Sequence, residues 1–257
     1  MTLPDFALHE AATFDEAFAL RSRYGNDARY FSGGTALMLL MRAGLLHPAA
    51  LIGICALPGM RELSVEGGVA RIGAAMTHAE LARSPQLRQF LPTLAYTFDH
   101  VATRRVRNVA TVGGNLAHAN PHQDPPVTLT AFGAIAIARG PSGERRIALD
   151  DLFVDYFQTC LDPDEILTGI EIPTAGTGSG SAFIKHLPRS ADDYAAVNVA
   201  VCLEREGDRV TSARIVVGSM GPTVLRSAEA EGLLTGGAMN DARVSSASEA
   251  AVAEADP

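Results

Sequence analysis

Two glycine pairs, each followed by short polar side chains, are the residues of this sequence whose types and spacing suit ligand binding. The first motif runs from Phe31 to Thr35 (FSGGT) and the second from Thr111 to Asn115 (TVGGN). Paired glycines at a strand end can adopt positive φ and present successive backbone N–H groups to an anion. One such motif alone indicates only a tight turn. Two of them predict loops that converge on an elongated phosphate-bearing ligand, such as a dinucleotide.

A metal site is the next candidate, because His118, His122 and Asp124 lie close together in the sequence. Pro121 stands between the histidines, so they do not share one helix face at positions i and i+4. We therefore interpret the three side chains as solvated loop residues and expect no bound metal.

Three arginines, Arg104, Arg105 and Arg107, form a basic cluster just before the second glycine motif. One interpretation is a solvated face of the protein. The other is a positive rim for a phosphate-bearing ligand or for an acidic partner surface. The sequence leaves both open.

Composition and charge exclude several classes of protein. The chain has 257 residues, of which 47% are hydrophobic and 19% charged, so it is an ordinary folded protein. Its formal net charge of −8 disfavours non-specific nucleic-acid binding, which needs a positive field. The cysteines, Cys55, Cys160 and Cys202, show no C-x-x-C spacing, so we expect neither a disulfide framework nor an iron–sulfur cluster.

The usual catalytic motifs are missing from the sequence. It contains no G-x-S-x-G, G-x-x-x-x-G-K-[ST], G-x-G-x-x-G or H-E-x-x-H pattern. A hydrolase, a P-loop NTPase and an NAD-binding Rossmann protein are therefore not supported.

Two α/β segments must position the glycine motifs. A capping box at Thr13 and Glu16 begins a helix, and Gly25 ends it. The elements predicted around the first motif are a strand at 29–31, a helix at 35–43 and a strand at 51–54. Those predicted around the second motif are a strand within 68–76, helical texture from 77 to about 103, a strand at 109–112, a helix near 127–132, and strands at 134–138, 146–149 and 166–172.

Residues 174–180 (TAGTGSG) have the composition of a linker, and the texture changes beyond them. An antiparallel hairpin is predicted from 196–203 and 210–217, and helices are predicted near 227–234 and from Ser245 onward. The first ten residues resemble no signal peptide, and the apolar stretches are shorter than the roughly 20 residues of a membrane span. We expect a cytoplasmic protein.

A family resemblance rests on three segments. The run from Arg107 to Leu116 (RNVATVGGNL), followed by Pro121 and Asp124, resembles the flavin-binding medium subunits of molybdenum hydroxylases, such as bacterial carbon monoxide dehydrogenases and xanthine dehydrogenases. The segment from Ser32 to Leu37 is similar to the earlier pyrophosphate loop of that family. The segment from Asp164 to Pro173 (DEILTGIEIP) resembles the strand that ends its flavin domain.

The resemblance implies an α+β fold with two domains. Residues 1–173 would form an FAD-binding domain of the vanillyl-alcohol-oxidase type, with subdomains at about 1–56 and 57–173. Residues 174–180 would be the linker. Residues 181–257 would form a small C-terminal α+β domain of the CO dehydrogenase flavoprotein type, with a three-stranded antiparallel sheet.

The resemblance also implies that the cofactor is FAD and which residues bind it. The expected cofactor-binding residues are Ser32, Gly33, Gly34, Thr35, Ala36, Thr111, Gly113, Gly114, Asn115, Asp124, Leu167 and Lys185. Both glycine motifs would hold the pyrophosphate through backbone N–H groups, and Asp124 would bind ribityl or ribose hydroxyls. Leu167 would line the adenine or flavin pocket. Lys185 would place a positive charge at the flavin, or it is an exposed strand residue.

The function implied is that of an oxidoreductase subunit with no catalytic residue or metal of its own. Electrons would come from a [2Fe–2S] small subunit after substrate oxidation in a molybdopterin-binding large subunit. They would leave through FAD to an external acceptor such as NAD, a quinone, a cytochrome or oxygen. The alternatives are a stand-alone flavoprotein oxidase or reductase and a flavin-free scaffold subunit.

Overall fold

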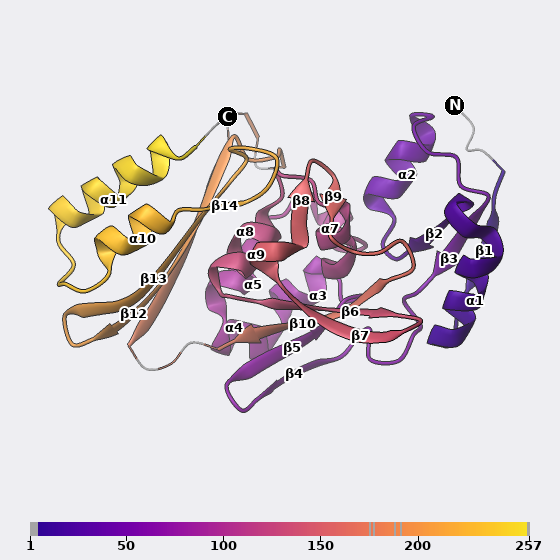
Figure 1. Ribbon diagram of the computed structural model, residues 1–257, viewed down its shortest axis with the longest axis horizontal. Coiled ribbons are helices and arrows are strands. Elements are labelled where there is room, and N and C mark those ends of the chain that lie inside the picture. The colour runs from indigo at the N-terminus through magenta and orange to yellow at the C-terminus, as the bar shows by residue number, and fades with distance from the viewer. Residues whose placement is uncertain (1–4, 175, 177, 188, 191, 256–257) are drawn as a thin grey trace.

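Among the described residues, three sheets of three or more strands follow one another along the molecule in chain order (Figure 1). The computed structural model describes residues 5–174, 176, 178–187, 189–190 and 192–255. Helices accompany each sheet, so the mixed α+β fold class predicted from the sequence is confirmed. None of the described helices combines the length and the hydropathy that a membrane span requires.

The N-terminal unit is a parallel sheet of three strands in the order β1–β3–β2. Its elements are β1 (Ala7–Glu10), α1 (Phe14–Tyr24), the short 3₁₀ helix η1 (Gly25–Asp27), β2 (Ala28–Phe31), α2 (Thr35–Arg42) and β3 (Ala50–Gly53). Thr13 Oγ1 accepts the N–H of Glu16 at the start of α1, and Gly25 ends that helix at a φ of 54°. Helix α2 buries only Met41 and stands apart from the rest of the unit (Figure 1).

The middle unit is an antiparallel sheet of five strands in the order β4–β5–β10–β6–β7. The strands are β4 (Leu63–Glu66), β5 (Val69–Gly73), β6 (Ile135–Gly140), β7 (Gly143–Ala148) and β10 (Ile166–Pro173). The helices are α3 (His78–Arg83), α4 (Pro85–Phe90), α5 (Pro92–Asp99), α6 (Arg104–Arg107), α7 (Val112–His118), α8 (Asp124–Ala131) and α9 (Leu149–Leu152). A two-stranded hairpin follows α9, formed by β8 (Phe153–Asp155) and β9 (Gln158–Thr159).

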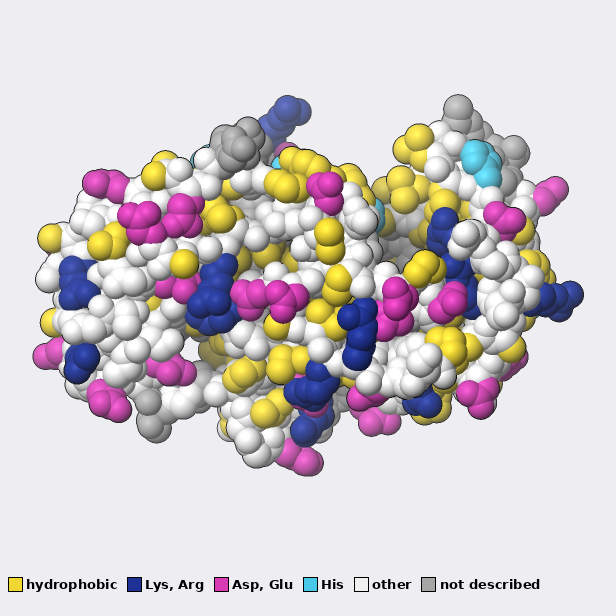
Figure 2. All heavy atoms as spheres, in the orientation of Figure 1, with side chains coloured by type: hydrophobic (Ala, Val, Ile, Leu, Met, Phe, Trp, Pro, Cys, Tyr) yellow, Lys and Arg dark blue, Asp and Glu magenta, His cyan; other side chains and the backbone are white. Residues whose placement is uncertain are grey.

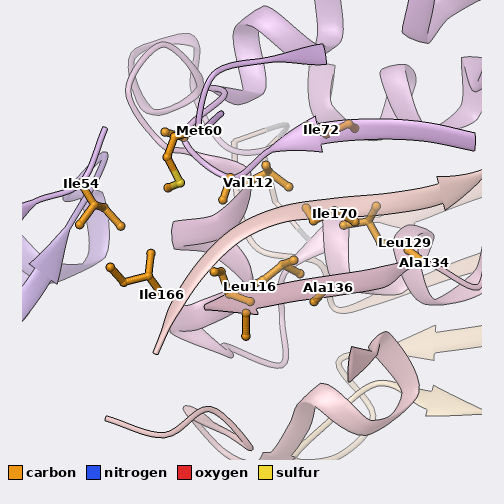
Figure 3. Packing of buried hydrophobic residues seen from close by; sticks show 14 of the residues in the cluster. Ile54, Met60, Ile72, Val112, Leu116, Leu129, Ala134, Ala136, Ile166 and Ile170 are labelled. Atoms are coloured by element: carbon orange, nitrogen blue, oxygen red, sulfur yellow. The ribbon is translucent and has the colours of Figure 1, made fainter. Parts of the chain in front are cut away.

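One apolar core joins these first two units. Side chains of β5, β6 and β10, including Ile72 and Ile170, lie against Leu116 of α7 and Leu129 of α8 (Figure 3). Ile54, which follows β3 of the first unit, belongs to the same buried cluster. The shared core fixes the first glycine motif, on β2 and α2, relative to the second motif on α7.

The C-terminal unit is an antiparallel sheet in the order β11–β12–β13–β14. Its elements are β11 (Ser179–His186), β12 (Val197–Glu206), β13 (Arg209–Gly218), β14 (Leu225–Arg226), α10 (Ala228–Leu234) and α11 (Asp241–Ala253). The three expected strands are β11 to β13, and the two-residue β14 extends the sheet. Helices α10 and α11 cover one face, while α8 packs against the other (Figure 1).

The structure corrects three predictions about elements. The predicted strand at 109–112 is wrong, because Thr111 makes only an isolated bridge to Thr77 and then caps helix α7, which begins at Val112. The last helix begins at Asp241 instead of Ser245, since Asn240 Oδ1 caps it. Strand β11 already includes the last two residues of the predicted linker, whose positions 175 and 177 lie outside the described residues.

Candidate cofactor-binding site

A cleft of about 1060 Å³ lies between α2 of the first unit and helices α6 and α7 of the second. The molecular surface is hollowed beside α2 (Figure 2). Ten of the twelve predicted cofactor-binding residues line this cleft. They are Ser32, Gly33, Gly34, Thr35, Ala36, Thr111, Gly114, Asn115, Asp124 and Lys185.

The two glycine motifs meet at the base of the cleft. Ser32 Oγ and Thr111 Oγ1 are hydrogen-bonded at 3.0 Å, although 79 residues separate them in the chain. Gly33 packs so closely on the segment before α7 that an added Cβ would overlap the carbonyl oxygen of Val109 and lie 2.9 Å from Ala110 Cα. The predicted convergence of the two motifs is therefore present, and it depends on Gly33 having no side chain.

The first motif has the features of an anion cradle. Gly34 adopts a left-handed conformation with a φ of 73° and precedes α2 without a side-chain cap. Among the described residues, the backbone N–H groups of Gly34, Thr35 and Ala36 have no protein acceptor. These donors point from the positive end of a helix dipole, an arrangement suited to a phosphate group.

The second motif does not match its prediction. Its glycines lie in the first turn of α7, and neither has a positive φ. The N–H of Gly113 donates to Ala74 O at 2.8 Å, that of Gly114 to Thr111 Oγ1 at 3.2 Å, and that of Asn115 to Thr111 O at 2.9 Å. Because these donors are already used inside the protein, the expectation that both motifs present free N–H groups is wrong for the second one.

Two predicted residues do not reach the cleft. An added Cβ on Gly113 would lie 2.6 Å from the Ala74 side chain, so this glycine serves the packing of α7 on the chain after β5. Leu167 is 6% exposed and belongs to the apolar core around β10. Both residues therefore lie beneath the residues that line the cleft and do not line it themselves.

Asn115 contributes a buried polar atom with no internal partner. Its Oδ1 accepts no hydrogen bond among the described residues, although the residue lines the cleft. A buried acceptor without a donor costs about 1–3 kcal/mol, which a ligand in the cleft would recover.

A buried ion pair joins the middle and C-terminal units at one side of the cleft. Lys185 Nζ on β11 lies 2.8 Å from Asp124 Oδ2, and the two side chains are 7% and 4% exposed. Asn198 Nδ2 donates to the other oxygen of Asp124 at 2.8 Å. Burial raises the pKa of Asp124, and the Lys185 charge and the Asn198 hydrogen bond oppose that rise. The alternative interpretation of Lys185 as an exposed strand residue is wrong.

The apolar wall of the cleft and its buried histidine were not predicted from the sequence. Leu39, Leu40 and Leu46 of α2 and the following loop line the cleft, and Leu39 is 66% exposed. Their signal was a helix apolar on all sides, which only a ligand or a partner can cover. His78 also lines the cleft, but its place within the capping box of α3 suggested only a helix start.

His78 is held in an apolar setting. Its ring stacks on Phe98 with centroids 5.4 Å apart, and neither ring nitrogen has a hydrogen-bond partner among the described residues. Burial, followed by the positive charge of Arg107, lowers the pKa of His78 to about 3. The imidazole is therefore neutral at physiological pH.

The arginines of the basic cluster lie outside the cleft, whereas the three side chains considered for a metal site line it. Arg104 and Arg105 are exposed, whereas Arg107 turns into the protein, and none of the three lines the cleft. His118 and His122 do line it, but within the described part of the chain no three His, Cys, Asp or Glu side chains are grouped to hold a metal ion.

The features of the cleft together fit a flavin dinucleotide. Free N–H groups at one point suit a pyrophosphate, a leucine wall suits a ring system, and buried polar groups at Asn115 and Asp124 suit hydroxyl and ring donors. The volume of about 1060 Å³ also lies at the upper end of ligand sites, which span about 300–1,000 Å³.

Comparisons with known proteins agree with this fit. The family model described as the FAD binding domain in molybdopterin dehydrogenase matches residues 4–175. The family model described as the CO dehydrogenase flavoprotein C-terminal domain matches residues 182–257.

Individual relatives match the chain from end to end. It is 33% identical to the carbon monoxide dehydrogenase medium chain of Hydrogenophaga pseudoflava, over 100% of this chain and 89% of that protein. It is 33% identical to the nicotine 6-hydroxylase medium subunit of Paenarthrobacter nicotinovorans, over 97% of this chain and 87% of that one. A solved carbon monoxide dehydrogenase from Hydrogenophaga pseudoflava superposes with a TM-score of 0.96 at 34% identity, covering 100% of this chain and 89% of that chain.

Proposed function

Since this chain belongs to the family of FAD-binding medium subunits of molybdenum hydroxylases, we propose that it takes electrons from the [2Fe–2S] clusters of a partner subunit and passes them through FAD to an external acceptor. The family consists of oxidoreductase components, and FAD is the cofactor of the domain that spans residues 4–175. FAD supplies reversible electron transfer when it is bound. The observation that carries the proposal is the cleft in which the two glycine motifs meet beside free N–H donors.

The pyrophosphate would be held by the first motif. The unpartnered N–H groups of Gly34, Thr35 and Ala36 support this role, as does the left-handed Gly34 that aims them. The second motif would support the first from behind, through Thr111 and the close approach of Gly33 to Val109. Asn115 Oδ1 would accept a hydrogen bond from the cofactor.

The Asp124–Lys185 pair would bind polar groups of the cofactor while carrying no net charge. Because each charge is neutralised by the other at 2.8 Å, Lys185 does not act as a free positive charge. Asn198 fixes the orientation of the carboxylate, so the pair is held in place before the cofactor binds. The leucines of α2 would exclude water from one side of the cofactor.

Partner subunits would complete the enzyme. A molybdopterin-binding large subunit would oxidise the organic substrate, and a [2Fe–2S] small subunit would relay the electrons. The external acceptor would be NAD, a quinone, a cytochrome or oxygen. A cytoplasmic location stays a prediction from the sequence.

Purification of the full chain with and without its partners tests the proposal. We expect a yellow protein whose flavin is released as FAD on denaturation, and co-purification of chains that carry molybdopterin and [2Fe–2S] clusters. The isolated chain should not oxidise an organic substrate, whereas the complex should. A colourless protein that fails to bind added FAD would contradict the proposal, and substrate turnover by the isolated chain would identify a stand-alone flavoprotein instead.

A further inference from the structure

Arg107 differs from its two neighbours in the basic cluster because its side chain is used inside the protein. Its Nη1 donates to Val101 O at 2.9 Å and to Ala102 O at 2.6 Å. Both carbonyl groups precede α6, and Arg107 is the last residue of that one-turn helix. The guanidinium therefore ties the end of α6 to the residues just before that helix.

The two residues that Arg107 holds belong to the wall of the cleft. Val101 and Ala102 both line it, and Val101 is 9% exposed. Ala102 has a φ of 41°, a left-handed conformation that an alanine adopts only at a cost of about 1–2 kcal/mol. A strained turn of this kind persists where neighbouring groups hold it, and the two charge-assisted hydrogen bonds from Arg107 do so.

We propose that Arg107 is a positioning residue for the cofactor: it fixes the Val101–Ala102 turn in the conformation that the bound FAD contacts. Arg107 itself does not line the cleft, so it acts through the turn and not by direct contact. The inference rests on the proposed function, in that FAD must occupy this cleft.

The electrostatics around Arg107 favour the same role. Its positive charge, after burial, is the second cause that keeps the pKa of His78 low, so the cleft wall beneath the turn stays uncharged. The Val101–Ala102 turn and His78 thus form a preorganised wall that Arg107 supports from behind, so cofactor binding does not have to order it.

The test measures FAD binding by apoprotein variants. R107A should weaken FAD affinity by roughly 10-fold, because two charge-assisted hydrogen bonds to the turn are lost. The matched control is R105A, which removes an exposed arginine from the same helix turn and should leave the affinity within twofold of wild type. The visible circular dichroism of the bound flavin should change in R107A and not in R105A, since only the first alters the wall around the cofactor.

Chemical rescue separates positioning from a general structural role. Millimolar guanidinium should restore much of the FAD affinity of R107A by occupying the vacated site, whereas an equal concentration of potassium chloride should not. If R107A does not fold, R107Q takes its place and is judged by the affinity and dichroism criteria. FAD affinity within twofold of wild type with an unchanged flavin spectrum, in the variant that folds, would overturn the inference.

A second variant keeps this result distinct from the proposed function. G33A, which forces the two glycine motifs apart, should lose FAD whether or not Arg107 has a role. If G33A loses FAD and R107A keeps it, only the role of Arg107 is wrong. If both keep FAD, the cleft is not the cofactor site.

Discussion

The two glycine motifs are alike in sequence but differ in what their glycines do. In the first motif Gly34 is left-handed, and the N–H groups that follow it have no protein acceptor among the described residues. In the second motif both glycines are helical and every donor from Val112 to Asn115 is used internally. A glycine pair can therefore serve a ligand or serve packing, and the hydrogen bonds of the neighbouring backbone tell which.

The largest effect on FAD affinity should come from disturbing the close contact between the two motifs. In G33A the added methyl group would overlap backbone atoms of Val109, which cannot move aside as a flexible side chain can. We expect FAD affinity to fall by more than about 100-fold, equivalent to about 2.7 kcal/mol. Titration of the apoprotein with FAD measures it.

G180A is the control for that variant, since the space around Gly180 in β11 is open. It should bind FAD as the wild type does. G33A protein that keeps its FAD affinity within threefold would show that the contact between the motifs is not needed for the cradle.

The second prediction compares the two glycines of the second motif. G113A places a Cβ 2.6 Å from the Ala74 side chain and should reduce the free energy of unfolding by about 2–3 kcal/mol. G114A meets only the Thr111 hydroxyl, at 2.9 Å, and the better helix propensity of alanine offsets part of the cost of shifting it, so the loss should stay below about 1 kcal/mol. Urea denaturation of both variants decides the matter, and equal effects would disprove the assignment of Gly113 to packing.

The third prediction concerns pH and the dry packing behind the second motif. His78 donates its backbone N–H to Ala110 O, and its ring has a pKa of about 3 in the folded protein, against about 6.5 when unfolded. Between these values the unfolded chain binds the extra proton, so stability falls as the pH is lowered. From pH 7 to pH 5 this one group should cost about 2 kcal/mol of the free energy of unfolding.

The H78F variant checks the origin of that loss. Phenylalanine keeps the stacking on Phe98 and cannot titrate, so the FAD-free variant should lose about 2 kcal/mol less than the wild type over the same pH interval. An identical pH dependence in both proteins would mean that His78 has the same pKa in the folded and unfolded states, which contradicts its burial as a neutral ring.

The sequence was sufficient for most elements and for the polar side of the cleft, but not for its leucine wall or for His78. Caps and turns such as Thr13, Gly25 and Thr77 act locally, so their signals survive without knowledge of the fold. The glycine motifs were assigned to one site because two of them implied a shared ligand, and ten predicted residues do line one cleft.

The rest depended on tertiary contacts that no local pattern contains. The segment before Gly113 is rich in β-branched residues, yet Thr111 caps a helix there, because Ala74 and Met76 accept the first N–H groups of that helix. Asn198 stood on the side of β12 opposite its valines, and only the docking of α8 on that side shows that Asn198 is buried against Asp124. The sequence does not distinguish Arg107 from Arg104 and Arg105. Only the folded chain shows that Arg107 donates to Val101 O.

The ion pair between Asp124 and Lys185 also has a consequence for biosynthesis. Its partners are 61 residues apart, and the Ser32–Thr111 contact spans 79 residues, so the cleft is assembled almost entirely from contacts of long sequence separation. Such contacts form late, after the loop entropy between them has been overcome. A nascent chain from which β11 has not yet emerged thus lacks one side of the cleft, and the complete cleft forms only after synthesis has passed Lys185.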